Sequence, residues 1–185
     1  MTQFQEQGFQ KVKGFIPSFF STYLRNYFTL RVQNEGLGGD TQAPNSHCVY
    51  GDPAFEMVMA MSTEDIGRIV EKKLIPQYTY ARIYKNGSVL ERHSDRPECQ
   101  YSITLCLGGE YDKQWPIWIQ DYDGKDYEVP LDEGDMLVYS GCELEHWREK
   151  FEGNMQYQLF MQYVDTEGEF KDRVYDGRPN LGLKK

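Results

Sequence analysis

The hydrophobic pattern of this 185-residue chain changes its period at Pro76. Before Pro76, apolar residues recur at the spacing of one helix face over residues 16–27 and 66–74. We place the start of the second helix at Ser62, where the sequence has the pattern of a capping box. Aromatic residues then alternate with other residues over 78–84, which is the period of a strand. The chain is therefore predicted to be helical first and strand-rich afterwards.

Short alternating segments separated by turn residues fill the chain after Pro76. Beyond the first strand, the expected strands are QYSITLCLGG, PIWIQDY, DYEVPL, DMLVYSG, ELEHWRE and MQYQLFMQYVD. Asp123 and Gly124 lie between two of them, and an Asp-Gly link is a strong hairpin signal. Many short strands with regular turn signals indicate a sandwich, a jelly roll or a barrel, here braced by the N-terminal helices.

The length of the chain favours one domain over residues 1–185. We expect residues 1–75 to form helical and loop support, residues 76–165 to form the β core, and residues 166–185 to form a polar tail on the surface. Residues 34–53 are rich in Gly, Asn, Asp and Pro and are predicted to be a long loop. Loops of this length in compact domains are often functional.

The charge balance limits the partners of the chain. Lys and Arg number 20 against 29 Asp and Glu, so the net charge of −9 should repel nucleic acid and anionic membrane. The sequence contains no apolar run of the length that a signal peptide or membrane span needs, and we expect a cytoplasmic protein. The four cysteines show no C-x-x-C spacing, which argues against a zinc ribbon.

His93 and Asp95 form an H-x-D pair, and His146 follows near the end of a different expected strand. Residues two apart on a strand point the same way, so His93 and Asp95 could address one ion. Two imidazoles and one carboxylate can occupy one face of an iron(II) octahedron and leave the other positions open. From spacing alone, the alternative that both histidines only satisfy loop hydrogen bonds carries about equal weight.

The segments YTYARIYKNGSVLERHSD, YSITLCLGG, EGDMLVYSG and CELEHWREKFEG resemble the iron(II)/2-oxoglutarate-dependent dioxygenases, in particular the prolyl-4-hydroxylase-like branch. The resemblance covers residues 76–165. It implies a double-stranded β-helix (jelly-roll) core, with His93, Asp95 and His146 as the iron ligands. It also implies that Tyr84 lies near the 2-oxoglutarate.

The sequence departs from that family in one respect. The family usually supplies an Arg or Lys on the strand after the distal histidine, where it pairs with the far carboxylate of 2-oxoglutarate. Here Gln156 and its neighbours hold that place, and residues 151–164 contain no cation. Because a buried carboxylate without a positive partner costs several kcal/mol, a substitute is needed. Arg148 is our first candidate, since it lies two residues beyond His146; Arg82 is the second.

The resemblance implies a hydroxylase that uses Fe(II), 2-oxoglutarate as cosubstrate and O2, with ascorbate as an optional cofactor. It suggests peptidyl proline as the substrate, and a free amino acid or another small metabolite is the alternative. A carboxylate at Asp95 favours hydroxylation, because halogenating relatives keep that position small. A non-oxidative cupin-type binding or isomerase module and an accessory protein with a decayed site are rival readings. The oligomeric state stays open.

Overall fold

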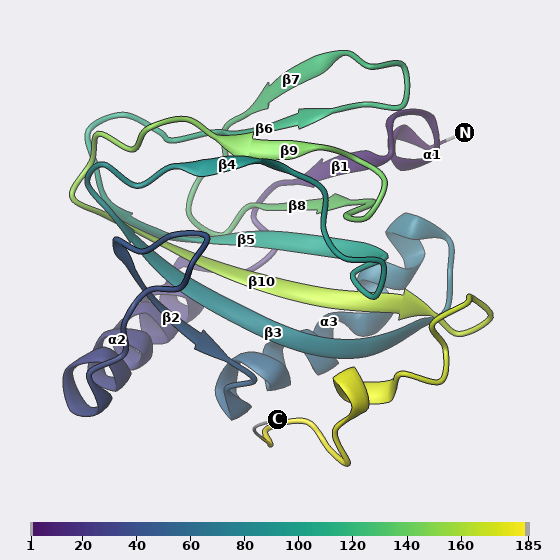
Figure 1. The fold of residues 1–185 in the computed structure, drawn as a ribbon, viewed down its shortest axis with the longest axis horizontal. Coiled ribbons are helices and arrows are strands. Elements are labelled where there is room, and N and C mark those ends of the chain that lie inside the picture. Colours follow the sequence, from purple (N-terminus) through teal and green to yellow (C-terminus); the bar gives the residue numbers. More distant parts are fainter. Residues whose placement is uncertain (1, 184–185) are drawn as a thin grey trace.

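The computed structural model describes residues 2–183 and is built on two facing β-sheets, with helices α2 and α3 packed outside the larger one (Figure 1). The larger sheet has six strands in the order β1-β8-β5-β10-β3-β2, and the smaller has four in the order β4-β9-β6-β7. Every recorded strand pair is antiparallel. The chain is thus mainly β with N-terminal helices, as predicted.

The helices are α1 (Gln3–Gln7), α2 (Ser18–Glu35), α3 (Pro53–Val70) and the short 3-10 helix η1 (Val174–Gly177). The strands are β1 (Phe9–Val12), β2 (Ser46–Tyr50), β3 (Leu74–Lys85), β4 (Leu90–His93), β5 (Tyr101–Glu110), β6 (Ile117–Gln120), β7 (Asp126–Val129), β8 (Met136–Tyr139), β9 (His146–Arg148) and β10 (Met155–Asp165). Within the described residues, no helix has the length and apolar character required to cross a lipid bilayer.

Helix α3 begins earlier than the sequence pattern predicted. Its N-cap is Asp52, whose side chain accepts hydrogen bonds from the backbone N–H groups of Ala54 and Phe55, and Pro53 occupies the first helical position. Ser62 lies inside the helix, where its hydroxyl donates to the carbonyl of Val58. The predicted capping box at Ser62 is therefore wrong.

Two strands lie in the region predicted as helix and loop. Strand β1 pairs with β8, and β2 pairs with β3 over residues 46–50, inside the predicted 34–53 loop. The tail also differs from a purely surface segment. Asp176 and Arg178 are buried, and Arg178 forms an ion pair with the buried Glu56 of α3. These charged groups tie residues after 165 to the folded body of the protein.

The six-stranded sheet separates an apolar layer from a polar interior. On β10, Leu159 and Met161 join the core that the sheet forms with α2 and α3, as do Ala81 and Ile83 on β3. Side chains alternate along a strand, so the intervening residues of these two strands face the smaller sheet. The functional candidates lie in this space between the sheets.

Candidate metal centre

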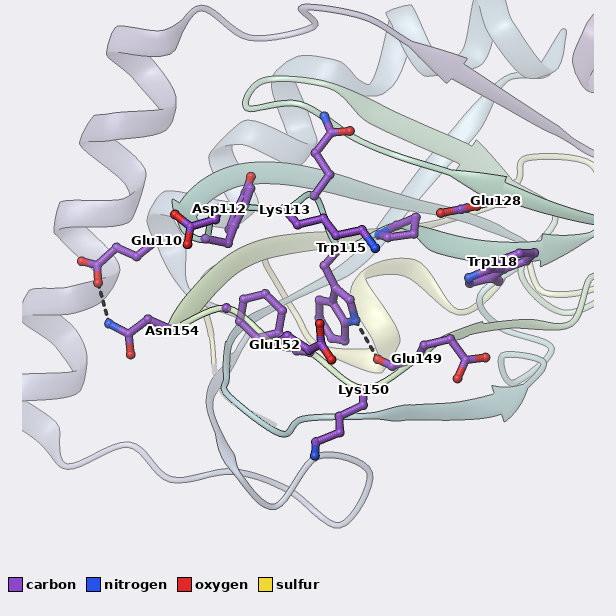
Figure 2. Close-up of a pocket in the computed structure, with 15 residues that line it drawn as sticks. Glu110, Asp112, Lys113, Trp115, Trp118, Glu128, Glu149, Lys150, Glu152 and Asn154 are labelled. Atoms are coloured by element: carbon purple, nitrogen blue, oxygen red, sulfur yellow. Dashed lines mark hydrogen bonds between the residues drawn. The ribbon is translucent and has the colours of Figure 1, made fainter.

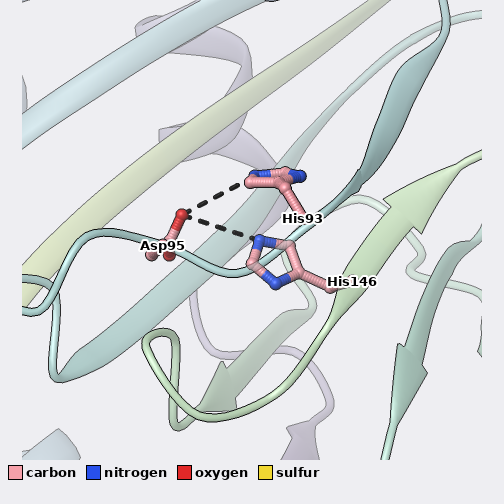
Figure 3. A group of neighbouring side chains, drawn as sticks. All are labelled: His93, Asp95 and His146. Carbon is pink, nitrogen blue, oxygen red and sulfur yellow. Dashed lines mark ion pairs between the residues drawn. The ribbon is translucent and has the colours of Figure 1, made fainter.

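His93, Asp95 and His146 form the one group of metal-ligating side chains found among the described residues (Figure 3). Their ligand atoms all lie within 4.8 Å of one another. Oδ1 of Asp95 is 3.7 Å from Nε2 of His93 and 3.7 Å from Nε2 of His146. The structure thus brings together three residues that the sequence separates by up to 53 positions.

Strand pairing sets the two imidazoles side by side. His93 is the last residue of β4 and His146 is the first of β9, and the two are register partners. Their ring centroids are 4.4 Å apart. Asp95 lies in the loop after β4, and its backbone N–H donates to the carbonyl of Gly141. The loop that carries Asp95 is therefore fixed to the turn that leads into β9.

Hydrogen bonds at the second ring nitrogen orient both imidazoles. Nδ1 of His93 lies 2.7 Å from the carbonyl oxygen of Glu91, and Nδ1 of His146 lies 3.1 Å from that of Leu144. Each Nδ1 donates to its carbonyl, which leaves each Nε2 as an acceptor; Nε2 of His93 lies 3.0 Å from the amide nitrogen of Gln42. Burial lowers the pKa of His146, the charge of Asp95 acting in the opposite direction. A neutral imidazole is the form that binds a metal.

Ser102 and Gly141 hold the Asp95 carboxylate in place. Oγ of Ser102 donates to Oδ2 of Asp95 at 2.6 Å. A Cβ at Gly141 would lie 2.1 Å from Oγ of Ser102 and 2.6 Å from Oδ2 of Asp95, so only glycine fits there. Residues that contact a metal ligand orient that ligand and adjust the affinity of the site for the metal.

The donor set fits a divalent transition metal. Two ligand atoms bound at right angles, each about 2.1 Å from one ion, are about 3 Å apart. The observed 3.7 Å separations exceed this only slightly. Two histidines and one carboxylate on one side leave further coordination positions open, as in non-haem iron(II) oxygenases. His93, Asp95 and His146 could therefore hold iron(II).

Arg148 is a fully buried cation without an acidic partner. The side chain has an exposed fraction of 0%, and no salt bridge to it is recorded among the described residues. One nitrogen donates to the carbonyl of Trp115, while Nε and the second Nη have no hydrogen-bond partner. Burial lowers the pKa of Arg148, but the guanidinium starts so high that it keeps its charge at neutral pH. A buried, unpaired guanidinium is a strong site for a carboxylate ligand.

Further unsatisfied polar groups lie between the sheets. Gln156 pairs in register with Tyr84, and Gln158 with Arg82. Oε1 of Gln156 and Nε2 of Gln158 are buried without a partner. Tyr84 is completely buried against Trp115. Thr104 donates to Oε1 of Gln158, which leaves the amide N–H groups of Gln158 free to donate.

A cavity of about 240 Å³ contains the three metal-ligand candidates and Arg82. Arg82 donates to the hydroxyl of Tyr84 and to Asp40 and Gln42, which belong to the α2–β2 loop (residues 36–45). Asp40 and Gln42 line the same cavity. Sequence reasoning missed both residues, because only the tertiary path of the loop brings them there.

A larger cavity of about 790 Å³ is lined by Trp115 and Trp118 (Figure 2). Residues 110–116 and 149–154 form most of its wall, and Trp115 donates there to the carbonyl of Glu149. None of His93, Asp95 and His146 lines it. Of these two cavities, only the smaller one is lined by the metal-ligand candidates.

No protein-family model and no curated protein matches the chain in sequence. Solved structures match it closely in shape. A prolyl-4-hydroxylase from Pseudomonas putida is similar with a TM-score of 0.71 and 17% identity, over 88% of this chain and 95% of that one. The chain has the fold of the iron(II)/2-oxoglutarate-dependent oxygenases.

Two further oxygenase-fold structures hold ligands. A prolyl hydroxylase from Trichoplax adhaerens, in complex with a peptide fragment of hypoxia inducible factor, has a TM-score of 0.72 and 15% identity, covering 89% of this chain and 87% of that one. HygX from Streptomyces hygroscopicus, with nickel, 2-oxoglutarate and hygromycin B bound, has a TM-score of 0.68 and 16% identity, covering 89% and 85%. The double-stranded β-helix predicted from the sequence is confirmed as the fold.

Proposed function

We propose that the protein is an iron(II)- and 2-oxoglutarate-dependent hydroxylase. The observation that carries the proposal is the unpaired, fully buried Arg148, two residues along β9 from a His-Asp-His cluster. An isolated buried charge is destabilising by several kcal/mol unless a partner neutralises it. A bound dicarboxylate with one end at the metal and the other at Arg148 supplies that partner.

In this proposal His93, Asp95 and His146 hold iron(II), and Arg148 binds the far carboxylate of 2-oxoglutarate. Bound there, iron(II) supplies the activation of O2 that converts 2-oxoglutarate into succinate and CO2 and hydroxylates a substrate C–H bond. Gln158 donates its free amide hydrogens to the same carboxylate. Tyr84 accepts a hydrogen bond from Arg82 and keeps its own hydroxyl hydrogen to donate.

The departure from the usual family pattern has a physical account in this proposal. Gln156 stands where a cation was expected, but it is buried and lies one register step from Gln158 on β10. Arg148 supplies the charge from the opposite sheet, and the two glutamines supply neutral polar groups. The positive charge is thus supplied by Arg148 on β9 instead of by a residue on β10.

Peptidyl proline and a small molecule are the two substrate classes to separate. The fold accommodates both, since one similar structure holds a peptide and another holds hygromycin B. A non-oxidative cupin-type module would not require the unpaired Arg148, and a decayed site would not require three converging ligand atoms. We therefore favour the hydroxylase over both rivals.

Conversion of 2-oxoglutarate to succinate without substrate tests this proposal. The purified protein is incubated in air with Fe(II), 2-oxoglutarate and, in parallel, added ascorbate. We expect succinate from the wild type, none from His93→Ala, and a raised 2-oxoglutarate requirement for Arg148→Ala. The matched control is His47→Ala, which removes a histidine of β2 outside the cluster. Absence of succinate from the wild type and all variants would contradict the hydroxylase proposal.

A further inference from the structure

We propose that Arg82 binds a carboxylate of the substrate, and that Asp40 occupies this position as an internal competitor until the substrate displaces it. The inference rests on the proposed function and names its substrate class as a small molecule with a free carboxylate. Three features of the cavity support this inference. They are the unpaired Nε of Arg82, the number of anionic groups available to pair with the two buried arginines, and the position of the α2–β2 loop.

Arg82 has a hydrogen-bonding edge that is only half used. The side chain is 4% exposed and lies in the cavity that contains the three metal-ligand candidates. One terminal nitrogen donates to Tyr84 and the other to Asp40 and Gln42, while the buried Nε has no partner among residues 2–183. A carboxylate bound side-on to Nε and the adjacent nitrogen would satisfy that edge completely.

The pairing of charges in the site leaves Arg82 available to a carboxylate of the substrate. In the proposed function, one carboxylate of 2-oxoglutarate binds iron and the other binds Arg148, so the cosubstrate has no anionic group left for a second guanidinium. Asp40 is the carboxylate that pairs with Arg82 in this structure. A carboxylate from the substrate can replace Asp40 without changing the net charge around Arg82.

Asp40 is the partner that can leave. Its side chain is 27% exposed, whereas that of Arg82 is 4% exposed, so water can solvate the carboxylate once it is released. Burial alone would raise the pKa of Asp40, but the hydroxyl of Tyr80, the N–H of Ala43 and the charge of Arg82 lower it, so Asp40 is ionised at neutral pH. Asp40 therefore competes as an anion.

Gln42 links Arg82 to the metal ligands. Its carbonyl oxygen accepts from Arg82 at 3.1 Å, and its amide nitrogen lies 3.0 Å from Nε2 of His93. That amide donates to the lone pair that a metal would use, so metal binding has to release Gln42 from His93. Gln42 then keeps only its hydrogen bond with Arg82, and this weaker attachment favours movement of the α2–β2 loop away from Arg82.

The cavity favours a small acid over a peptide. Its volume of about 240 Å³ has to hold the reacting group of the substrate and the iron-bound end of the cosubstrate, while Arg148 lies outside its lining. The α2–β2 loop forms part of the wall, and it is held by the hydrogen bonds that Asp40 accepts from Tyr80 and Arg82. In peptidyl proline the prolyl carboxyl group is an amide and carries no charge for Arg82. A free amino acid or another small carboxylic acid meets both conditions.

Thermal unfolding of the anaerobic protein loaded with Fe(II) and 2-oxoglutarate tests this inference. The probes are the free L-amino acids, proline included, each compared with its own uncharged amide. A ligand that binds only the folded protein raises the melting temperature. We expect at least one acid to raise it where its amide does not, and a proline-containing peptide blocked at both ends to have no effect.

Substitutions at Asp40 and Arg82 distinguish an internal competitor from a purely structural ion pair. Asp40→Asn removes the internal competitor, so the affinity for the acid should rise about tenfold. Arg82→Gln should remove the preference for acid over amide, and Arg82→Lys should restore part of it. Asp112→Asn, an exposed aspartate beside the larger cavity, is the matched control and should change nothing. If the pair were only structural, Asp40→Asn would weaken acid binding or leave it unchanged.

The two proposals fail in different ways. If Fe(II) and 2-oxoglutarate stabilise the protein but no acid exceeds its amide, or if Arg82→Gln keeps the acid preference, the inference about Arg82 is overturned alone. If Fe(II) and 2-oxoglutarate themselves give no stabilisation, the proposed function is overturned, and the inference with it.

Discussion

The two faces of the six-stranded sheet have opposite characters. The face toward α2 and α3 carries residues such as Leu159 and Met161, which pack in an apolar core. The face toward the smaller sheet carries Arg82, Gln156 and Gln158. The alternation of side chains along β3 and β10 produces both faces from the same strands. One face supplies stability, and the other holds polar groups that a bound molecule would satisfy.

The distribution of unsatisfied polar atoms supports this division. Among the described residues, the buried side-chain atoms without a hydrogen-bond partner belong to Thr79, Arg82, Arg148, Gln156 and Gln158. All but Thr79 lie between the two sheets. Native proteins leave few such groups, and each needs an explanation. In the proposed function, a ligand that binds between the sheets would satisfy these groups.

The largest expected effect is the loss of the metal site. His146→Ala removes a buried ligand, and we expect no detectable Fe(II) binding and no turnover of 2-oxoglutarate, because two ligands do not hold the ion. Calorimetric titration with Fe(II) under anaerobic conditions measures this. Retained stoichiometric binding in His146→Ala would show that the ion binds elsewhere.

On the apolar face, Leu159→Ala should reduce the free energy of unfolding by about 2–5 kcal/mol, since it leaves a cavity beneath α2 and α3. Urea denaturation monitored by circular dichroism measures the loss. The affinity for Fe(II) at a temperature where the variant is folded should match that of the wild type. A large change in affinity would break the separation between the two faces.

Between the sheets, Arg148→Met should impair ligand binding without reducing the stability of the protein. Replacing a buried, unpaired cation with an apolar side chain should leave the ligand-free protein equally stable or more stable by about 1–4 kcal/mol. The 2-oxoglutarate requirement for succinate formation should rise, because the far carboxylate loses its guanidinium. Arg92→Met, at an exposed arginine of β4, is the control and should change stability by less than about 1 kcal/mol. A strongly destabilised Arg148→Met would show that Arg148 serves the fold.

The smallest expected effect concerns the support of Asp95. Ser102→Ala removes the hydroxyl that donates to the carboxylate, and the affinity for Fe(II) should fall by about 10-fold to 100-fold without loss of the site. Ser62→Ala, at a buried serine of α3, is the matched control and should leave the affinity unchanged. Equal effects of the two substitutions would indicate a general loss of packing.

Local patterns predicted most of the fold. The alternation after Pro76 gave β3 and the strands from β5 to β10, but not β1 or β4. The hairpin at Asp123 and Gly124 joins β6 to β7 as expected. Strand β2 was missed because its residues lie among Gly, Asn and Pro and become a strand only through pairing with β3. Asp52 was missed as the N-cap of α3 because the Ser62 pattern nearby satisfied the same rule.

Spacing offered His93, Asp95 and His146 as candidates, and the family resemblance was needed to favour them as metal ligands. The structure brings the three side chains together, because the ends of β4 and β9 are paired. Asp40 and Gln42 were not predictable, because their positions follow from the path of the α2–β2 loop through space. The burial of Arg148 without a partner is likewise a tertiary property, although its spacing from His146 marked it as a candidate.

The most direct test of the account is an anaerobic titration of the Fe(II)-loaded protein with 2-oxoglutarate, followed by visible absorption. Chelation of iron by the cosubstrate produces a weak metal-to-ligand charge-transfer band. We predict that the band appears in the wild type and saturates, and that Arg148→Met reaches it only at much higher 2-oxoglutarate. No band in the wild type, or identical titrations for both proteins, would contradict the assignment of the space between the sheets to iron and 2-oxoglutarate.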